Sequence, residues 1–268
     1  MTFNWIKHLL VCCLWMAMPC QANINVRSFH LSTEQGLGAN YVRSITQDSK
    51  GYLWMGATNG LIRYDGYSSK LITPANTDNR RLMLDERVQV VQVWLKRFIL
   101  LRLRGGHYSC YDAQTDRFVD YTGDGTYGES WQRHQLLDNG ELWLINAGGK
   151  GKVISYNGTA FHSRNIRKGE TLPKEATPTL PEKYRYLLTP GRQLLTDNRG
   201  NLIVASPEGS LWYISKKTQQ MTLLTGVFSN ELVKLNGDPR YSVITDKDGI
   251  IWVSTFGNGL FAYDPQKR

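Results

Sequence analysis

The feature that most constrains the fold of this 268-residue chain is a motif that occurs once near each end. Residues 45–66 read ITQDSKGYLWMGATNGLIRYDG, and residues 244–264 read ITDKDGIIWVSTFGNGLFAYD. Aligning Trp54 with Trp252 also aligns the glycine three residues before each, and after one extra residue the Asn-Gly-Leu and Tyr-Asp segments align too. Self-similarity of this kind is the signature of a repeat architecture, so further copies are expected between the two.

Three weaker copies lie between them. One runs from Leu136 to Gly158, one begins at Asp197 and continues to Tyr213, and a degenerate copy spans 88–118. The chain thus divides into five blade-like units, at about 41–70, 88–120, 131–162, 192–217 and 240–264. Residues 163–192 interrupt the period, are mostly polar and contain four prolines. This pattern predicts an inserted loop, which is either a solvated excursion or a segment that reaches a partner or ligand.

Each unit has the pattern of short antiparallel strands. In the first unit an apolar strand reaches the turn Asp48 to Gly51, where glycine supplies the positive φ that such hairpins need. In the next strand Leu53 and Met55 point to one side and Trp54 to the other. Three or four such strands every 40 to 50 residues, roughly, are the period of a propeller blade. We therefore predict an all-β fold, a β-propeller of about five recognisable blades that form either a closed or an incomplete ring. The tryptophans are expected to pack between blades, the alternative being ligand stacking.

The N-terminus has the pattern of a secretory signal. Lys7 and His8 precede an apolar run of about ten residues, and Cys20 and Ala22 occupy the small-residue positions of a cleavage site. This predicts a signal peptide over residues 1–22, the alternative being an uncleaved anchor.

The mature chain is then a propeller over residues 23–268. It keeps Cys110 as its one cysteine, so no internal disulfide is expected. No segment after the signal is long and apolar enough to span a membrane. The net charge of +9 comes mostly from scattered residues, which does not indicate a nucleic-acid partner.

No segment carries a catalytic or metal-binding signature. The mature histidines stand in neither a His-x-x-x-His nor a His-x-Glu context, which argues against zinc. The glycine clusters lack the spacing of dinucleotide and phosphate loops. The turn that begins at Asp246 has Gly257 where a calcium loop needs glutamate. We therefore expect no catalytic residue, no metal, no cofactor and no enzymatic activity.

The aligned units give one set of candidate ligand-binding residues. The residue eight positions before each turn glycine begins the innermost strand and is expected at the mouth of the channel. In four units it is Arg43, Gln132, Arg192 or Tyr241. Polar and aromatic side chains at a channel mouth can hydrogen-bond a sugar or an anion, the alternative being solvated rim residues.

The segment from Gly36 to Gly66 resembles the first blade of the two-component regulator propeller family. The match is strongest from Gln47 to Gly66, and residues 246–264 match well. The resemblance implies the periplasmic sensor region of a bacterial hybrid two-component system, many of which respond to glycan breakdown products. We therefore expect a ligand-sensing propeller for a glycan-derived ligand, such as an oligosaccharide. The alternatives are a structural or protein-interaction propeller, including a non-functional sensor fragment, and a propeller hydrolase or lyase.

In that family a β-sandwich domain, a membrane helix and a histidine kinase follow the propeller, whereas this sequence stops at Arg268. The resemblance therefore implies a sensor without its own kinase, one that acts as a homodimer or with a separately encoded sensor kinase. The segment from Ile24 to Leu31 looks like a closing strand. In a ring of about seven blades it would lack its partner, and two apolar blade faces would be exposed.

Overall fold

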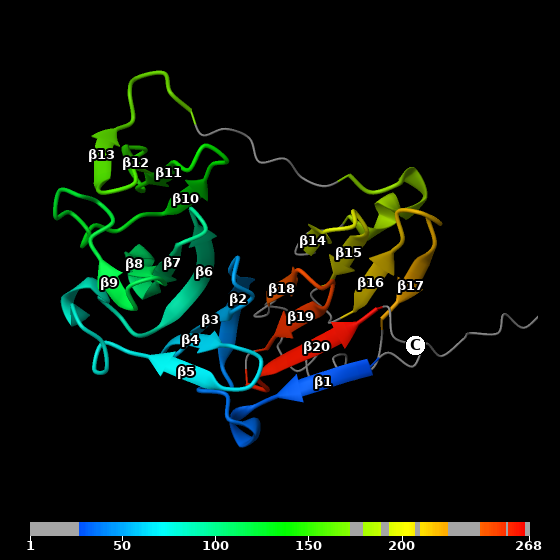
Figure 1. Cartoon of the computed structure of the whole chain (residues 1–268). Helices are drawn as coiled ribbons and strands as arrows, with labels where there is room; N and C mark the ends of the chain where they lie inside the picture. Colours follow the sequence, from blue (N-terminus) through cyan, green and yellow to red (C-terminus); the bar gives the residue numbers. More distant parts are fainter. Residues whose placement is uncertain are drawn as a thin grey trace, which may run out of the picture.

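The computed structural model describes residues 27–171, 179–188, 193–206, 210–224, 242–255 and 257–265. In these ranges twenty strands form five four-stranded antiparallel sheets, which are the blades in Figure 1. The prediction of an all-β propeller with about five blades is confirmed. The predicted signal peptide, Arg192 and Tyr241 lie outside the described residues.

The first four blades each consist of strands that are consecutive in the sequence. Blade 1 contains β2 (Val42–Gln47), β3 (Leu53–Ala57), β4 (Gly60–Tyr64) and β5 (Ser69–Ile72). Blade 2 contains β6 (Val88–Trp94), β7 (Phe98–Leu103), β8 (Tyr108–Asp112) and β9 (Arg117–Val119). Blade 3 contains β10 (Arg133–Leu136), β11 (Leu142–Ile145), β12 (Gly151–Tyr156) and β13 (Phe161–Asn165). Blade 4 contains β14 (Gln193–Thr196), β15 (Leu202–Ala205), β16 (Leu211–Ile214) and β17 (Met221–Leu223).

Blade 5 takes one strand from the other end of the chain. It contains β18 (Ser242–Thr245), β19 (Ile251–Ser254) and β20 (Leu260–Asp264), and its outer strand is β1 (Arg27–Leu31). β1 pairs with β20 along its whole length, from Arg27 opposite Asp264 to Leu31 opposite Leu260. The predicted closing strand therefore has a partner in blade 5. The ladder joins the two ends of the described chain, and blades 1 and 5 are neighbours.

The first strand of each blade lies on the inside of the molecule. β2 contacts both β6 and β18, and β14 contacts β18. Blade 1 therefore lies beside blades 2 and 5, and blade 5 lies beside blade 4. Figure 1 shows them as an arc, with blades 3 and 4 at its two ends. Short 3-10 turns complete the described structure: η1 (Thr33–Gln35), η2 (Arg80–Leu82), η3 (Arg104–Gly106) and η4 (Glu182–Leu187). None of these has the length and apolarity that a helix crossing a membrane would need.

The hydrophobic core lies between the blades. Trp54 of blade 1 is fully buried and packs with Val88, Ile99 and Tyr111 of blade 2. Similar clusters join blades 2 and 3, blades 4 and 5, and blades 5 and 1. The prediction that the motif tryptophan packs between blades is confirmed at Trp54. Each blade is thus stabilised mainly by its neighbours, because a single sheet cannot bury its own apolar faces.

Two parts of the predicted inserted loop over residues 163–192 are not solvated loop. Residues 163–165 complete β13, because they pair with β12. Leu180 lies two residues before η4 and Leu187 is its last residue. Both are buried against Val204 and Ile214 of blade 4. Residues 179–188 therefore cover the face of blade 4 that points away from blade 5. The local sequence is polar and proline-rich, and its two buried leucines form no periodic apolar pattern from which packing on blade 4 could be predicted.

Candidate functional site

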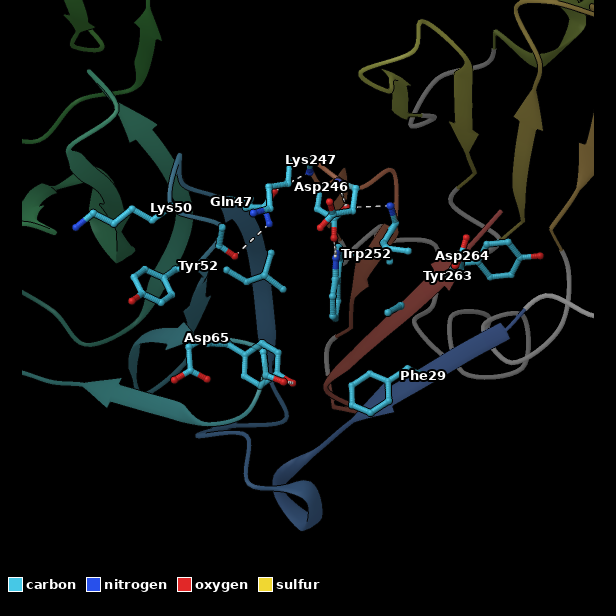
Figure 2. A pocket seen from close by; sticks show the side chains of 17 residues that line it. Phe29, Gln47, Lys50, Tyr52, Asp65, Asp246, Lys247, Trp252, Tyr263 and Asp264 are labelled. Atoms are coloured by element: carbon cyan, nitrogen blue, oxygen red, sulfur yellow. Dashed lines mark hydrogen bonds between the residues drawn. The ribbon is translucent and has the colours of Figure 1, made fainter. Parts of the chain in front are cut away.

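A groove of about 550 Å³ opens between blades 1 and 5 (Figure 2). Its two walls include the two best copies of the repeated motif, with the turns at residues 48–51 and 246–249 on opposite sides. These turns follow the ends of the inner strands β2 and β18. Segments that are about 200 residues apart in the sequence meet here because β1 pairs with β20 and then leads into blade 1.

The aspartate of each motif holds its turn in one conformation. Oδ1 of Asp48 accepts the backbone N–H groups two and four residues further on, at 2.9 and 3.0 Å, and Oδ2 accepts the indole N–H of Trp54 at 2.8 Å. Asp246 accepts the corresponding backbone groups at 2.9 Å and the indole N–H of Trp252 at 2.8 Å. The glycine three residues after each aspartate has a positive φ, 94° and 84°. These bonds explain the spacing of Asp, Gly and Trp in the motif and give the groove two rigid walls.

The side chains in the groove combine aromatic faces with charged and amide groups. Trp252 and Phe29 lie on the blade 5 side (Figure 2). The ring of Tyr52 turns away from the groove and packs against the cluster between blades 1 and 2. Gln47 links the two walls, because its Oε1 accepts the backbone N–H of Lys247 at 2.8 Å. Its Nε2 donates to the carbonyl of Gly51 at 3.1 Å.

Asp65, on the blade 1 side of the groove, is held in its ionised form. The backbone N–H groups of Ser68 and Tyr67 donate to its Oδ1 and lower the pKa of the carboxyl below its ordinary value. The hydroxyl of Ser68 donates to Oδ2. An ionised carboxylate can accept hydrogen bonds from a ligand, but it cannot serve as a general acid.

The predicted binding residues lie away from this groove. Arg43 is the second residue of β2 and Gln132 directly precedes β10, so both mark the starts of inner strands, whereas the groove lies at the ends of inner strands. Gln132 lines a second hollow, of about 650 Å³, between blades 2 and 3. A binding role for Arg43 and Gln132 stays a prediction. The motif indicated the groove residue Trp252, whereas Phe29 enters the groove only through the pairing of β1.

The interface between blades 2 and 3 contains a partly buried, neutral histidine. Nε2 of His134 lies 2.7 Å from Oε1 of Gln92, and Nδ1 lies 2.7 Å from the hydroxyl of Tyr108. Because an amide oxygen only accepts, Nε2 carries the proton and Nδ1 accepts from the tyrosine. Burial, and secondly the charge of Arg102, lower the pKa of His134 to about 4.

We expect His134 to make the protein less stable at acid pH. Between about pH 6.5, the ordinary histidine pKa, and pH 4 the unfolded chain takes up a proton that the folded chain does not, so stability falls by about 3 kcal/mol. Urea unfolding of the wild type and of His134→Gln across this pH range measures the effect. Glutamine can keep both hydrogen bonds and does not titrate, so the variant should lose this part of the slope. If the free energy of unfolding depends on pH in the same way in both proteins, His134 is not the group responsible.

No group of three or more His, Cys, Asp or Glu side chains within the described ranges is arranged to hold a metal ion. Cys110 is a free, buried cysteine, and burial raises the pKa of its thiol well above the ordinary value. The thiol is therefore protonated and unreactive at neutral pH.

The repeated motif can now be compared with known families. The profile described as two component regulator propeller matches residues 36–59 and 234–257. The chain carries repeats of the two-component regulator propeller family. The matched segments start 198 residues apart and end 198 residues apart, which is also the separation of Trp54 and Trp252. The family resemblance predicted from the sequence is confirmed.

Solved structures are similar to this propeller-repeat chain at low identity. The extracellular domain of the hybrid two component system BT3049 from B. thetaiotaomicron is 17% identical, with a TM-score of 0.55, and the match covers 90% of this chain and 42% of that one. The corresponding domain of BT4673 from B. thetaiotaomicron is 16% identical, with a TM-score of 0.49, covering 88% and 39%. A streptogramin B lyase is 12% identical, with a TM-score of 0.48, covering 89% and 97%.

The likeness to BT3049 shows a shared propeller fold. The propeller-repeat chain spans less than half the length of the two extracellular domains. A comparison with curated proteins gave no match.

Proposed function

We propose that this chain is a periplasmic, ligand-sensing β-propeller of a two-component system, that it binds a glycan-derived ligand, and that it catalyses no reaction. The groove between blades 1 and 5 carries the proposal, because it combines aromatic faces with a fixed carboxylate between two rigid turns. The propeller repeats and the likeness to an extracellular domain of a hybrid two component system support the sensor role.

The chemistry of the groove suits a sugar. One face of a pyranose ring presents C–H groups that pack on an aromatic ring such as Phe29 or Trp252. Its hydroxyl groups donate to carboxylate and amide oxygens, which Asp65 and Gln47 supply. A volume of about 550 Å³ lies within the usual range for small-ligand pockets.

The same groove does not favour glycoside cleavage. That reaction needs two carboxyl groups across the bond, one of them with a raised pKa so that it can donate a proton. The pKa of Asp65 is lowered instead. The oxygens of Asp246 already accept two backbone N–H groups and an indole N–H. These observations support a binding function without catalysis.

A location at the junction of blades 1 and 5 gives the ligand a route to signalling. The groove lies where β1 completes blade 5, next to blade 1. A ligand that contacts both walls stabilises this junction relative to the same junction in the unliganded protein. The altered junction would be recognised by a second copy of the chain or by a sensor kinase, the partners expected from the sequence.

Calorimetric titration of neutral oligosaccharides into the purified chain tests the proposal. We expect saturable binding of at least one sugar, and a loss of at least tenfold in affinity in Phe29→Ala, which removes an exposed groove aromatic. Tyr186→Ala is the matched control, because Tyr186 is 64% exposed and lies on η4, away from the groove. Equal affinities in the two variants, or hydrolysis of the sugar by the wild type, would overturn the assignment.

A further inference from the structure

The second hollow, between blades 2 and 3, contains a cation without a carboxylate partner. Arg102 lies near the end of β7 and lines the hollow of about 650 Å³. Its Nε is buried and has no hydrogen-bond partner among the described residues. Its Nη2 makes one long hydrogen bond, 3.4 Å, to the carbonyl of Gln132. No ion pair to Arg102 occurs in the described part of the chain.

The neighbouring arginine on the same blade shows the usual arrangement. Arg97 donates from Nε and Nη2 to the two carboxylate oxygens of Asp112, at 3.0 and 2.6 Å. A guanidinium that is partly withdrawn from water needs such an acceptor, because losing hydration without a partner is unfavourable. At Arg102 the acceptor is missing from the described protein, and the open space in front of it is large enough to hold one from outside.

The rest of the hollow's lining favours a negatively charged ligand. It contains no aspartate or glutamate, and it includes neutral side chains that can donate hydrogen bonds, such as Gln132 and Asn146. Oδ1 of Asn146 accepts the N–H groups of Gly148 and Lys150, at 3.0 and 3.1 Å, which directs its NH2 group away from this turn. Trp131, which also lines the hollow, has a buried Nε1 without a partner among the residues described.

We propose that this hollow binds an oxyanion group, a carboxylate, sulfate or phosphate, with Arg102 as its principal ligand. The planar guanidinium presents two parallel N–H donors that match two oxygens of such a group. The hollow is lined by the starts of the inner strands of blades 2 and 3. The groove between blades 1 and 5, the proposed sugar groove, lies at the ends of inner strands. The anion site is therefore separate from the proposed sugar site and does not depend on it.

Titration of the full chain with sodium sulfate, phosphate and glucuronate, at constant ionic strength and with glucose as the uncharged reference, tests the site. We expect saturable binding of at least one anion and a loss of at least tenfold in affinity in Arg102→Gln. Arg102→Lys should retain part of the affinity, because it keeps the charge but loses the two-donor geometry. Arg133→Gln is the control, because it removes one exposed positive charge from the adjacent strand β10.

The anion series also distinguishes two sources of the oxyanion. Equal affinity for sulfate and glucuronate would indicate a free inorganic anion, whereas tighter binding of glucuronate would indicate an acidic sugar. Urea unfolding without added anion gives a second readout. Arg102→Gln should keep the wild-type stability, whereas Arg97→Gln should lose stability because it leaves Asp112 buried and unpaired. Non-saturable anion effects, or equal loss of affinity in Arg102→Gln and Arg133→Gln, would overturn the proposal.

Discussion

Replacing Trp54 with alanine is expected to lower the free energy of unfolding by about 3–5 kcal/mol, the usual effect of removing a buried tryptophan. Trp54 is fully buried between blades 1 and 2, where its ring lies 5.6 Å from that of Tyr111. The change opens a cavity in the inter-blade core. It also removes the indole donor from Oδ2 of the buried Asp48, which adds the penalty of an unsatisfied carboxylate oxygen.

The equivalent change in the second motif, Trp252→Ala, is the matched comparison. Trp252 makes the same hydrogen bond to its aspartate, but it is only partly buried and faces the groove. We therefore expect a smaller loss of stability, together with weaker sugar binding. Urea unfolding of both variants, with the slopes compared to confirm two-state behaviour, measures the difference. Equal losses at the two positions would contradict the account of what the motif tryptophans do.

Removing β1 is expected to have the second large effect. A chain that begins at Ser32 loses the ladder to β20, the burial of Leu31 and the stacking of His30 on Phe261, whose ring centroids are 4.4 Å apart. Burial of one leucine contributes about 1.5–3 kcal/mol on its own. In addition β20 becomes an open edge strand, which favours association with other chains.

A chain that begins at Asn23 is the control for this truncation, because it keeps β1. Thermal unfolding followed by circular dichroism should show a cooperative transition for the control and a broad or much lower transition for the shorter chain. Size-exclusion chromatography should show aggregation of the shorter chain. If both chains are monomeric and melt together, β1 does not stabilise blade 5.

The blades could be predicted because their turns are specified locally. An aspartate, a glycine three residues later and a tryptophan after a further three encode a turn and its hydrogen bonds within a few residues of sequence. Weaker copies keep part of this chemistry. Glu141 accepts the indole N–H of Trp143 at 3.1 Å, and Asp197 accepts the side-chain amide of Asn201 at 2.8 Å.

Other features depend on contacts between distant residues and leave little trace in the sequence. The first turn of blade 2 places Leu95 and Lys96 at positive φ, 54° and 56°, where glycine or asparagine would be the usual signal. The sugar groove requires two motifs from opposite ends of the chain to meet, so the sequence could indicate its walls but not their proximity. The predicted channel-mouth residues were chosen from strand position alone, which did not reveal that Gln132 lies beside Arg102, an arginine without an ion-pair partner among the described residues.

Thermal unfolding of the chain from Asn23 to Arg268, with and without a panel of neutral oligosaccharides, tests the proposed sensor function most directly. We expect one cooperative transition, and a rise in Tm with one class of sugar. At a hundredfold excess over Kd, binding stabilises the folded state by about 2.7 kcal/mol, or about 5–10 °C for a chain of this size. A chain that aggregates without a cooperative transition, or whose Tm no sugar changes, would contradict a self-contained sugar sensor.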